Sequence, residues 1–291
     1  MKSVTFLAST HTSDATPIVP LPSLLERICV RPPYFALSDI SLSGRYLRTS
    51  AVAEAPPFLE RAPMTSAELG RHAAIAGSCH AALSQKDDKR RFYLANHATC
   101  HYTASDAPYG TPVDFTTEVL SLTRRALQVR AWALAAERPL AEFTLSYTVL
   151  TEPTFYRLFQ QRRLPTFEQV NPYRRLLQVA CERGPDWAEQ EIPSLPAEAC
   201  AGHFESYPAL PVAVLMGQLS YLAGQIVADE PRPFRVVKGV VEADTLLWAH
   251  NPVRFRAERV GSDAALRRYR CAAFSHDAEV AGMDLWLELV D

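Results

Sequence analysis

The chain has 291 residues, 48% of them hydrophobic and 21% charged, which is enough apolar material for one large domain or two smaller ones. Its 30 basic and 32 acidic residues give a net charge of −2, which argues against non-specific nucleic-acid binding. The six cysteines show neither C-x-x-C pairs nor neighbouring metal-spaced histidines, so we expect reduced, buried thiols in a cytoplasmic protein.

No segment has the pattern of a membrane element. The first 17 residues are polar, and their apolar run is too short for a signal peptide. The segment between Glu205 and Asp229 carries no charge, but prolines, glutamines, a serine and a tyrosine interrupt it. A buried core helix fits this segment better than a membrane span does.

In the first half of the chain, the earliest strong element is a helix in TSAELGRHAAIAGSCHAALS, residues 65–84. Thr65 or Ser66 can cap its N-terminus, and Glu68 places a negative charge in the first turn, where it suits the helix dipole. Downstream, residues 141–149 alternate apolar and polar side chains, the pattern of a strand with one buried face. Strands are also expected at 113–121 and 126–135.

The second half predicts the same order of elements. Residues from about 151 to 185 are the linker and the start of this half, and Pro211 precedes a nearly uncharged helix, VAVLMGQLSYLAGQIVA. Three strands are expected to follow, at 253–260, 266–275 and 281–290.

These two halves align as an internal repeat. TPVDFTTEVLS from Thr111 matches NPVRFRAERVG from Asn251, and the same spacing of 140 residues continues without a gap through the next two strands. Chance similarity between strand-rich segments is the alternative. The repeat predicts an N-terminal unit at 1–150 and a C-terminal unit at 151–291, each with a long buried helix wrapped by an antiparallel sheet.

The segment GHFESYPALPVAVL resembles the active-site stretch of the hydroxyacyl-carrier-protein dehydratases, G-H-F-x-x-x-P-x-x-P-G-V-L. The resemblance implies an α+β double hotdog fold. It also implies that His203 is the catalytic base and that the backbone N–H of Val212 binds the thioester carbonyl. Phe204 and Tyr207 are expected to contact the substrate. The sequence departs from the family at Gly217, fourteen residues after His203, where the family carries an acid.

The first half supplies an acid instead. Glu68-x-x-x-His72 resembles the acid motif of the same family, E-x-x-x-Q, in which histidine replaces glutamine in related domains. The corresponding first-half stretch, AEAPPFLERAP, has no histidine. We therefore predict one composite site, with His203 as base, Glu68 as acid and His72 as a substrate contact. The second composite site, which pairs Gly217 with the first-half stretch, is expected to be inactive.

Simpler roles remain open for the same residues. His203 and His72 are also consistent with structural packing, and Glu68 with a charge at a helix N-terminus.

The resemblance implies removal of water from a 3-hydroxyacyl thioester in fatty-acid or polyketide-type biosynthesis. The substrate would be carried on the phosphopantetheine of an acyl carrier protein, and no other cofactor or metal is expected. The acidic carrier could dock on the short arginine clusters. Alternatives are a thioesterase with Glu68 as base, or a non-catalytic acyl-binding subunit. A monomeric pseudodimer or a low-order oligomer is expected.

Overall fold

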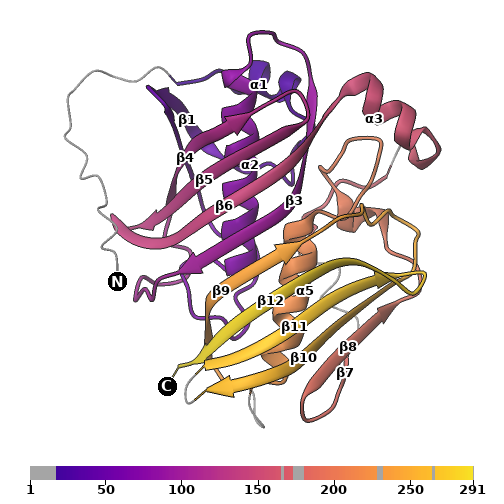
Figure 1. The fold of residues 1–291 in the computed structure, drawn as a ribbon. Helices are drawn as coiled ribbons and strands as arrows, with labels where there is room; N and C mark the ends of the chain where they lie inside the picture. Colours follow the sequence, from indigo (N-terminus) through magenta and orange to yellow (C-terminus); the bar gives the residue numbers. More distant parts are fainter. Residues whose placement is uncertain (1–17, 165–166, 173–179, 228–231, 264–265, 291) are drawn as a thin grey trace.

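The structure, a computed structural model, describes residues 18–164, 167–172, 180–227, 232–263 and 266–290 (Figure 1). Residues 1–17, with their short apolar run, and parts of the predicted linker lie outside these residues. No helix of the described ranges is long and apolar enough to cross a membrane. The six cysteines are free thiols, and five of them are buried, as the sequence pattern predicted.

One twelve-stranded antiparallel sheet forms the framework (Figure 1). Its spatial order is β1-β2-β4-β5-β6-β3-β9-β12-β11-β10-β8-β7. The first half contributes β1 (Ser38–Ser43), β2 (Tyr46–Ala51), β3 (Arg91–Tyr102), β4 (Val113–Leu122), β5 (Ala126–Ala135) and β6 (Arg138–Thr151). The second contributes β7 (Glu182–Arg183), β8 (Trp187–Ile192), β9 (Phe234–Glu242), β10 (Val253–Asp263), β11 (Leu266–Ser275) and β12 (Ala278–Leu289).

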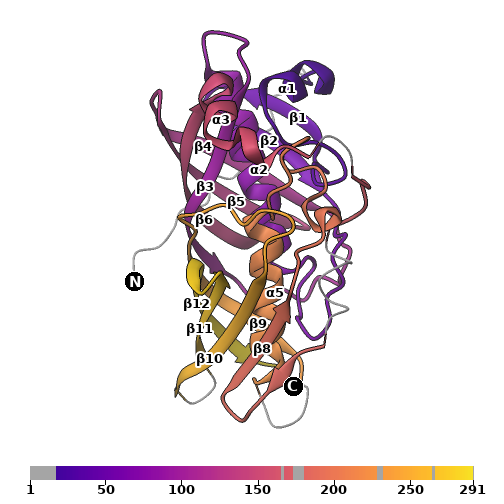
Figure 2. The ribbon, with the colours of Figure 1, turned by 90° about the vertical axis from the view of Figure 1, so that its right-hand side faces the viewer.

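Two long helices, α2 (Ser66–Ser84) and α5 (Val212–Gln225), lie against one face of the sheet, one in each half (Figures 1 and 2). Thr65 is the N-cap of α2, as predicted, and its Oγ1 accepts a hydrogen bond from the Glu68 N–H at 3.4 Å. Both helices are rich in small apolar residues, which allows them to pack against each other as well as on the sheet. The shorter helices of the described residues are α1 (Leu21–Arg27), α3 (Glu152–Phe159), η1 (Gln160–Arg162) and η2 (Ala197–Cys200).

The strand boundaries confirm the internal repeat. Strands β4, β5 and β6 begin at Val113, Ala126 and Arg138, and β10, β11 and β12 begin 140 residues later in each case. The irregularities repeat as well, because the register of β4 with β5 shifts after Val119 and that of β10 with β11 shifts after Arg259. A bulge is a specific backbone feature, so its recurrence at the same spacing is stronger evidence than the few matching residues.

Strands β3 and β9 pair at the centre of the sheet and join the two halves. The order of strands on either side of this pair is the same, so the halves are related by an approximate two-fold axis. Sequence patterns did not predict β1–β3, β7–β9 or the helices α1 and α3. Helix α3 follows directly after β6 and packs its Phe155 ring on Phe92 of β3 at a centroid distance of 3.6 Å. The unit boundary at residue 150 stays a prediction.

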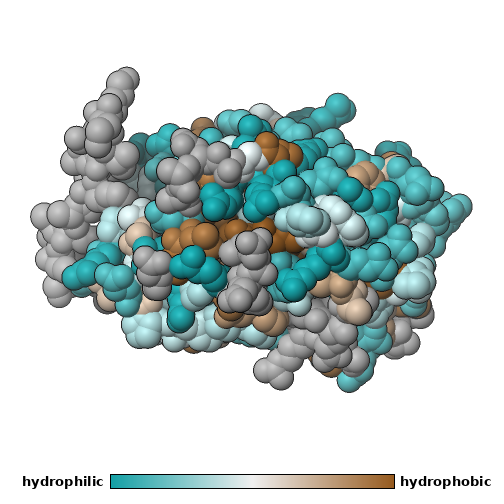
Figure 3. All heavy atoms as spheres, turned by 90° about the horizontal axis from the view of Figure 1, so that it is seen from below, coloured by the Kyte–Doolittle hydropathy of each residue, from teal (hydrophilic) through white to brown (hydrophobic). Residues whose placement is uncertain are grey.

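The surface below the two halves is mainly hydrophilic, with a hydrophobic strip near its centre (Figure 3). Exposed large apolar side chains of the described residues include Phe58, Leu158 and Val260.

Candidate functional site

The two-fold arrangement creates two sites between the halves. In each, the loop before one long helix meets residues of the other half. We call them the Glu60 pocket, between residues 55–60 and α5, and the His203 site, where the loop before α5 meets Tyr34 of the first half.

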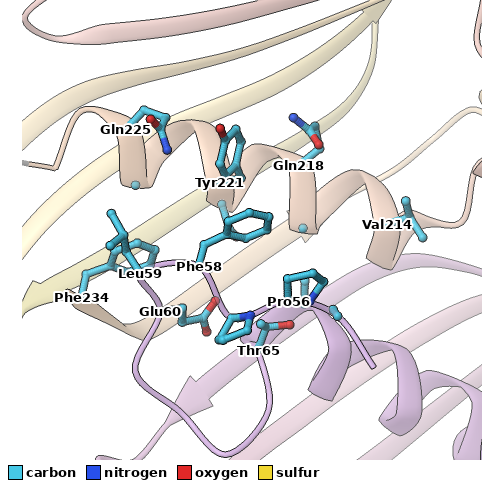
Figure 4. Close-up of a pocket in the computed structure, with 16 residues that line it drawn as sticks. Pro56, Phe58, Leu59, Glu60, Thr65, Val214, Gln218, Tyr221, Gln225 and Phe234 are labelled. Atoms are coloured by element: carbon cyan, nitrogen blue, oxygen red, sulfur yellow. The ribbon is translucent and has the colours of Figure 1, made fainter. Parts of the chain in front are cut away.

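The Glu60 pocket encloses about 620 Å³, part of it open to solvent. Figure 4 shows the segment around Glu60 and Thr65 on one side, and α5 with Gln218 and Tyr221 on the other. Phe58 and Tyr221 meet across the pocket with ring centroids 5.1 Å apart. Most of the remaining lining is apolar: Ala55, Pro56, Pro57, Leu59, Ala67, Val214, Gly217, Gly224 and Phe234.

Glu60 contributes a carboxyl group to this pocket. It is 9% exposed, and its Oε1 accepts a hydrogen bond from the Ser66 N–H at 2.7 Å. Burial raises the pKa of Glu60 to about 7, the Ser66 hydrogen bond opposes that rise, and the nearby charge of Glu68 adds to it. A carboxyl group with a pKa near 7 can take up and release a proton at neutral pH.

Gln218 brings an amide to the same pocket from α5. Its side chain is 2% exposed, and neither its Oε1 nor its Nε2 has a hydrogen-bond partner within the described part of the chain. A buried amide without partners costs free energy, so a polar ligand in the pocket would gain a hydrogen bond there.

The N-terminus of α2 also faces this pocket, since Thr65 and Ala67 both line it. The N–H groups in the first turn of a helix lack intrahelical acceptors and lie at the positive end of the helix dipole. Such an end suits a carbonyl oxygen that gains negative charge.

At the His203 site, the imidazole is held by the loop before α5. Its Nδ1 donates to the Ala209 carbonyl at 2.9 Å, which leaves Nε2 as the basic nitrogen of the neutral ring. The ring lies edge-on to Tyr34 at a centroid distance of 5.6 Å. Burial lowers the pKa of His203 to about 4.

Glu68 is fully buried near the start of α2. Its Oε1 accepts from the Glu54 N–H at 2.7 Å, and its Oε2 accepts from the Ala55 N–H at 3.1 Å. Arg71 Nη1 lies 3.8 Å from Oε1. These contacts fix residues 54 and 55 against α2, so Glu68 shapes one wall of the Glu60 pocket.

Tyr34 contacts the His203 ring, and Arg71, which packs on Tyr34, lies near Glu68. The guanidinium of Arg71 lies over the Tyr34 ring at 4.8 Å, and its Nε donates to the Tyr34 carbonyl at 2.7 Å. Within the described residues, His203 and Glu68 share no hydrogen bond or ion pair. Their joint action on one substrate stays a prediction.

The other predicted substrate contacts occupy different surroundings. His72 is buried, its Nε2 lies 3.7 Å from Glu68 Oε1, and burial lowers its pKa. Val212 is the first residue of α5. Phe204 is buried among aromatic residues, and the Tyr207 ring stacks on Tyr156 at 5.4 Å.

Comparison with known proteins gives structural matches only. No family model matches the chain, and no curated protein matches it in sequence. The TesB protein of Mycobacterium avium subspecies paratuberculosis is similar in structure, with a TM-score of 0.57, 14% identity, and coverage of 87% of this chain and 96% of that one. A 12:0-ACP thioesterase from Umbellularia californica has a TM-score of 0.57 and 9% identity, over 86% and 96% of the two chains.

A conserved hot dog fold protein from Alicyclobacillus acidocaldarius matches with a TM-score of 0.52 and 13% identity, over 90% of this chain and 99% of that chain. The fold is a double hotdog, as predicted.

The predicted dehydratase activity needs correction. The similar structures that are named for an enzyme activity are thioesterases, which are hydrolases and not hydro-lyases. The site gives a physical reason as well. A dehydratase must protonate the departing hydroxyl, but both oxygens of the proposed acid, Glu68, already accept backbone hydrogen bonds inside the core.

Sequence reasoning missed Glu60 and Gln218. The pairing of Gly217 with the first-half stretch was expected to be inactive, yet this is where the Glu60 pocket lies. One signal was present in the sequence. Glu60 is an acid within the apolar, proline-rich run APPFLERAP, directly before a helix cap.

Proposed function

We propose that this protein hydrolyses an acyl thioester in the Glu60 pocket. The observation that carries the proposal is a buried carboxyl group with a pKa of about 7, placed in an apolar pocket opposite an unpartnered amide. Perturbed acids in apolar pockets are common features of active sites. The structural similarity to thioesterases supports the same class of reaction.

In the proposed reaction, the Glu60 carboxylate takes a proton from a water molecule, and the water oxygen attacks the thioester carbonyl carbon. The C–S bond then breaks, and the departing thiolate receives the proton from Glu60. The products are a carboxylic acid and a free thiol. The acyl chain would lie along the apolar lining formed by Leu59, Tyr221 and Phe234.

Two groups would stabilise the tetrahedral intermediate. The Ala67 N–H in the first turn of α2 would donate to the oxyanion, because the Ser66 and Glu68 N–H groups already donate to Glu60 and Thr65. The Gln218 amide would hydrogen-bond the attacking water or the carbonyl oxygen. Neither group needs to be reorganised during the reaction, because helix packing fixes both.

We keep an acyl carrier protein as the proposed source of the acyl group. One similar structure is named for activity on a 12:0-ACP substrate, and the arginine clusters of this chain offer positive charge to an acidic carrier.

The proposal is tested by measuring thiol release from a panel of acyl thioesters with wild type, Glu60→Gln and His203→Ala. We expect Glu60→Gln to lose about 100-fold or more in kcat, because a general base contributes that much, and His203→Ala to retain activity. The opposite pattern, with His203→Ala inactive and Glu60→Gln active, would move catalysis to the His203 site. Absence of thiol release from every thioester would refute the hydrolase proposal.

A further inference from the structure

A second concave surface lies between α3 and the loop that follows His203. We call it the basic groove. It encloses about 1040 Å³, part of it open to solvent. Exposed arginines, Arg157 and Arg163, lie beside the partly buried Arg90, and the buried rings of Phe92 and Phe204 also contribute to the lining.

The charges of the groove do not balance. Glu205 forms ion pairs with two arginines. Arg31 Nε lies 2.8 Å from its Oε1, and Arg90 Nη1 lies 3.3 Å from its Oε2. Arg90 also lies 3.7 Å from Glu152. These two arginines and two glutamates neutralise one another.

By contrast, Arg157 and Arg163 form no hydrogen bond or ion pair with any residue that the structure describes. They leave the groove with two uncompensated positive charges.

Aromatic packing holds this arrangement in place. Phe155 of α3 stacks on Phe92 at 3.6 Å, and Tyr156 stacks on Tyr207 at 5.4 Å with an interplanar angle of 17°. The loop after His203 and helix α3 are therefore packed together, although they are distant in the sequence. This packing fixes the backbone that carries Arg157, so a ligand would find that part of the groove already formed.

We propose that the basic groove binds a small ligand that carries a phosphate monoester. A phosphate monoester has a charge near −2 at neutral pH, which matches the two uncompensated guanidinium groups. Arginine forms paired hydrogen bonds with phosphate oxygens, and the aromatic lining would pack against the apolar part of the ligand. The inference goes beyond the proposed hydrolysis, because the groove and the Glu60 pocket have no lining residue in common.

The test uses phenyl phosphate, with phenyl sulfate as a probe of the same shape but with a single negative charge. Binding to the full chain is measured by calorimetry or NMR titration at pH 7.5. We expect phenyl phosphate to bind about tenfold more tightly than phenyl sulfate, since the second charge strengthens its charge-assisted hydrogen bonds. Binding should also weaken as salt concentration rises.

Two double variants make the test specific. Arg157→Gln with Arg163→Gln should weaken phenyl phosphate binding by about tenfold or more. The matched control, Arg124→Gln with Arg125→Gln, removes another exposed pair at the β4–β5 turn and should leave binding unchanged. Equal affinity for the two probes, or equal loss in both double variants, would overturn the inference. Thiol release by the Arg157/Arg163 variant from thioesters without phosphate reports separately on the proposed hydrolysis.

Discussion

Glu60 and Glu68 are residues of the same type, but their surroundings give their carboxyl groups different roles. Glu68 has a backbone N–H on each oxygen and Arg71 nearby, so it serves as a structural acceptor. Among the described residues, Glu60 accepts from one backbone N–H, that of Ser66, and it lines a largely apolar pocket. Burial with few partners raises the pKa of a carboxyl group, and it is such a group that can exchange protons at neutral pH.

This difference predicts a pH profile for thiol release. The proposed base is the carboxylate form of Glu60, and its pKa in the folded chain is about 7. We therefore expect kcat/KM to rise with pH through about 7 and to level off above it. A profile that follows a single group near pH 4, the pKa of His203, would contradict this assignment.

The same pKa shift predicts a cost in stability. The pKa of Glu60 lies at about 7 in the folded chain, above its usual value of 4.5, so the folded state binds this proton more tightly than the unfolded state does. The free energy of unfolding should therefore fall as pH rises from 4.5 to 7, and it should stay lower above pH 7.

Glu60→Gln removes this penalty. We expect the free energy of unfolding of the variant to exceed that of wild type by up to about 3 kcal/mol at pH 8. Near pH 4.5 the two proteins should differ little. Denaturant unfolding at both pH values checks this expectation. A variant that is less stable than wild type at pH 8 would show that Glu60 is held mainly by favourable contacts.

At the scale of elements, the sequence predicted the parts that repeat with a clear period. Strands β4–β6 and β10–β12 were found because Val113 and Val253 begin matching alternations of apolar and polar residues. Helix α2 was found from its cap at Thr65. Strands β1 and β2 were missed because each is only six residues long and partly exposed, so its pattern does not stand out.

The site was harder to predict than its elements. Each composite site joins a loop from one half to a helix from the other, and the contacts that decide their roles are not local in sequence. The hydrogen bonds from Glu54 and Ala55 to Glu68 depend on how residues 54–55 pack against α2. Family resemblance identified the acid at Glu68, but it gave no information on whether packing leaves that acid accessible.

The packing of Glu68 leads to a prediction about α2. We expect Glu68→Ala to lower the free energy of unfolding by about 3–5 kcal/mol, because the buried Arg71 loses a partner and two N–H groups lose their acceptor. Glu68→Gln keeps an acceptor oxygen, so its free energy of unfolding should fall by less. Denaturant unfolding at pH 7 measures both. If Glu68→Ala folds with unchanged stability and loses all activity, Glu68 is catalytic as the resemblance implied.

At the scale of the whole molecule, the two halves share one sheet through β3 and β9 and pack their long helices together. Such a pseudodimer offers two composite sites, and this chain has diverged differently in each. One has kept an imidazole next to Tyr34, and the other has a pocket with Glu60 and Gln218. Internal duplication allows this divergence, because a single active centre is enough for one reaction.

The central claim, that the acyl thioester binds in the Glu60 pocket, is tested most directly by a crystal structure with a non-hydrolysable acyl thioether analogue. We expect the acyl chain between residues 55–60 and α5, with its polar end within hydrogen-bond reach of Glu60 and Gln218. An analogue bound beside His203, with the Glu60 pocket empty, would contradict the account.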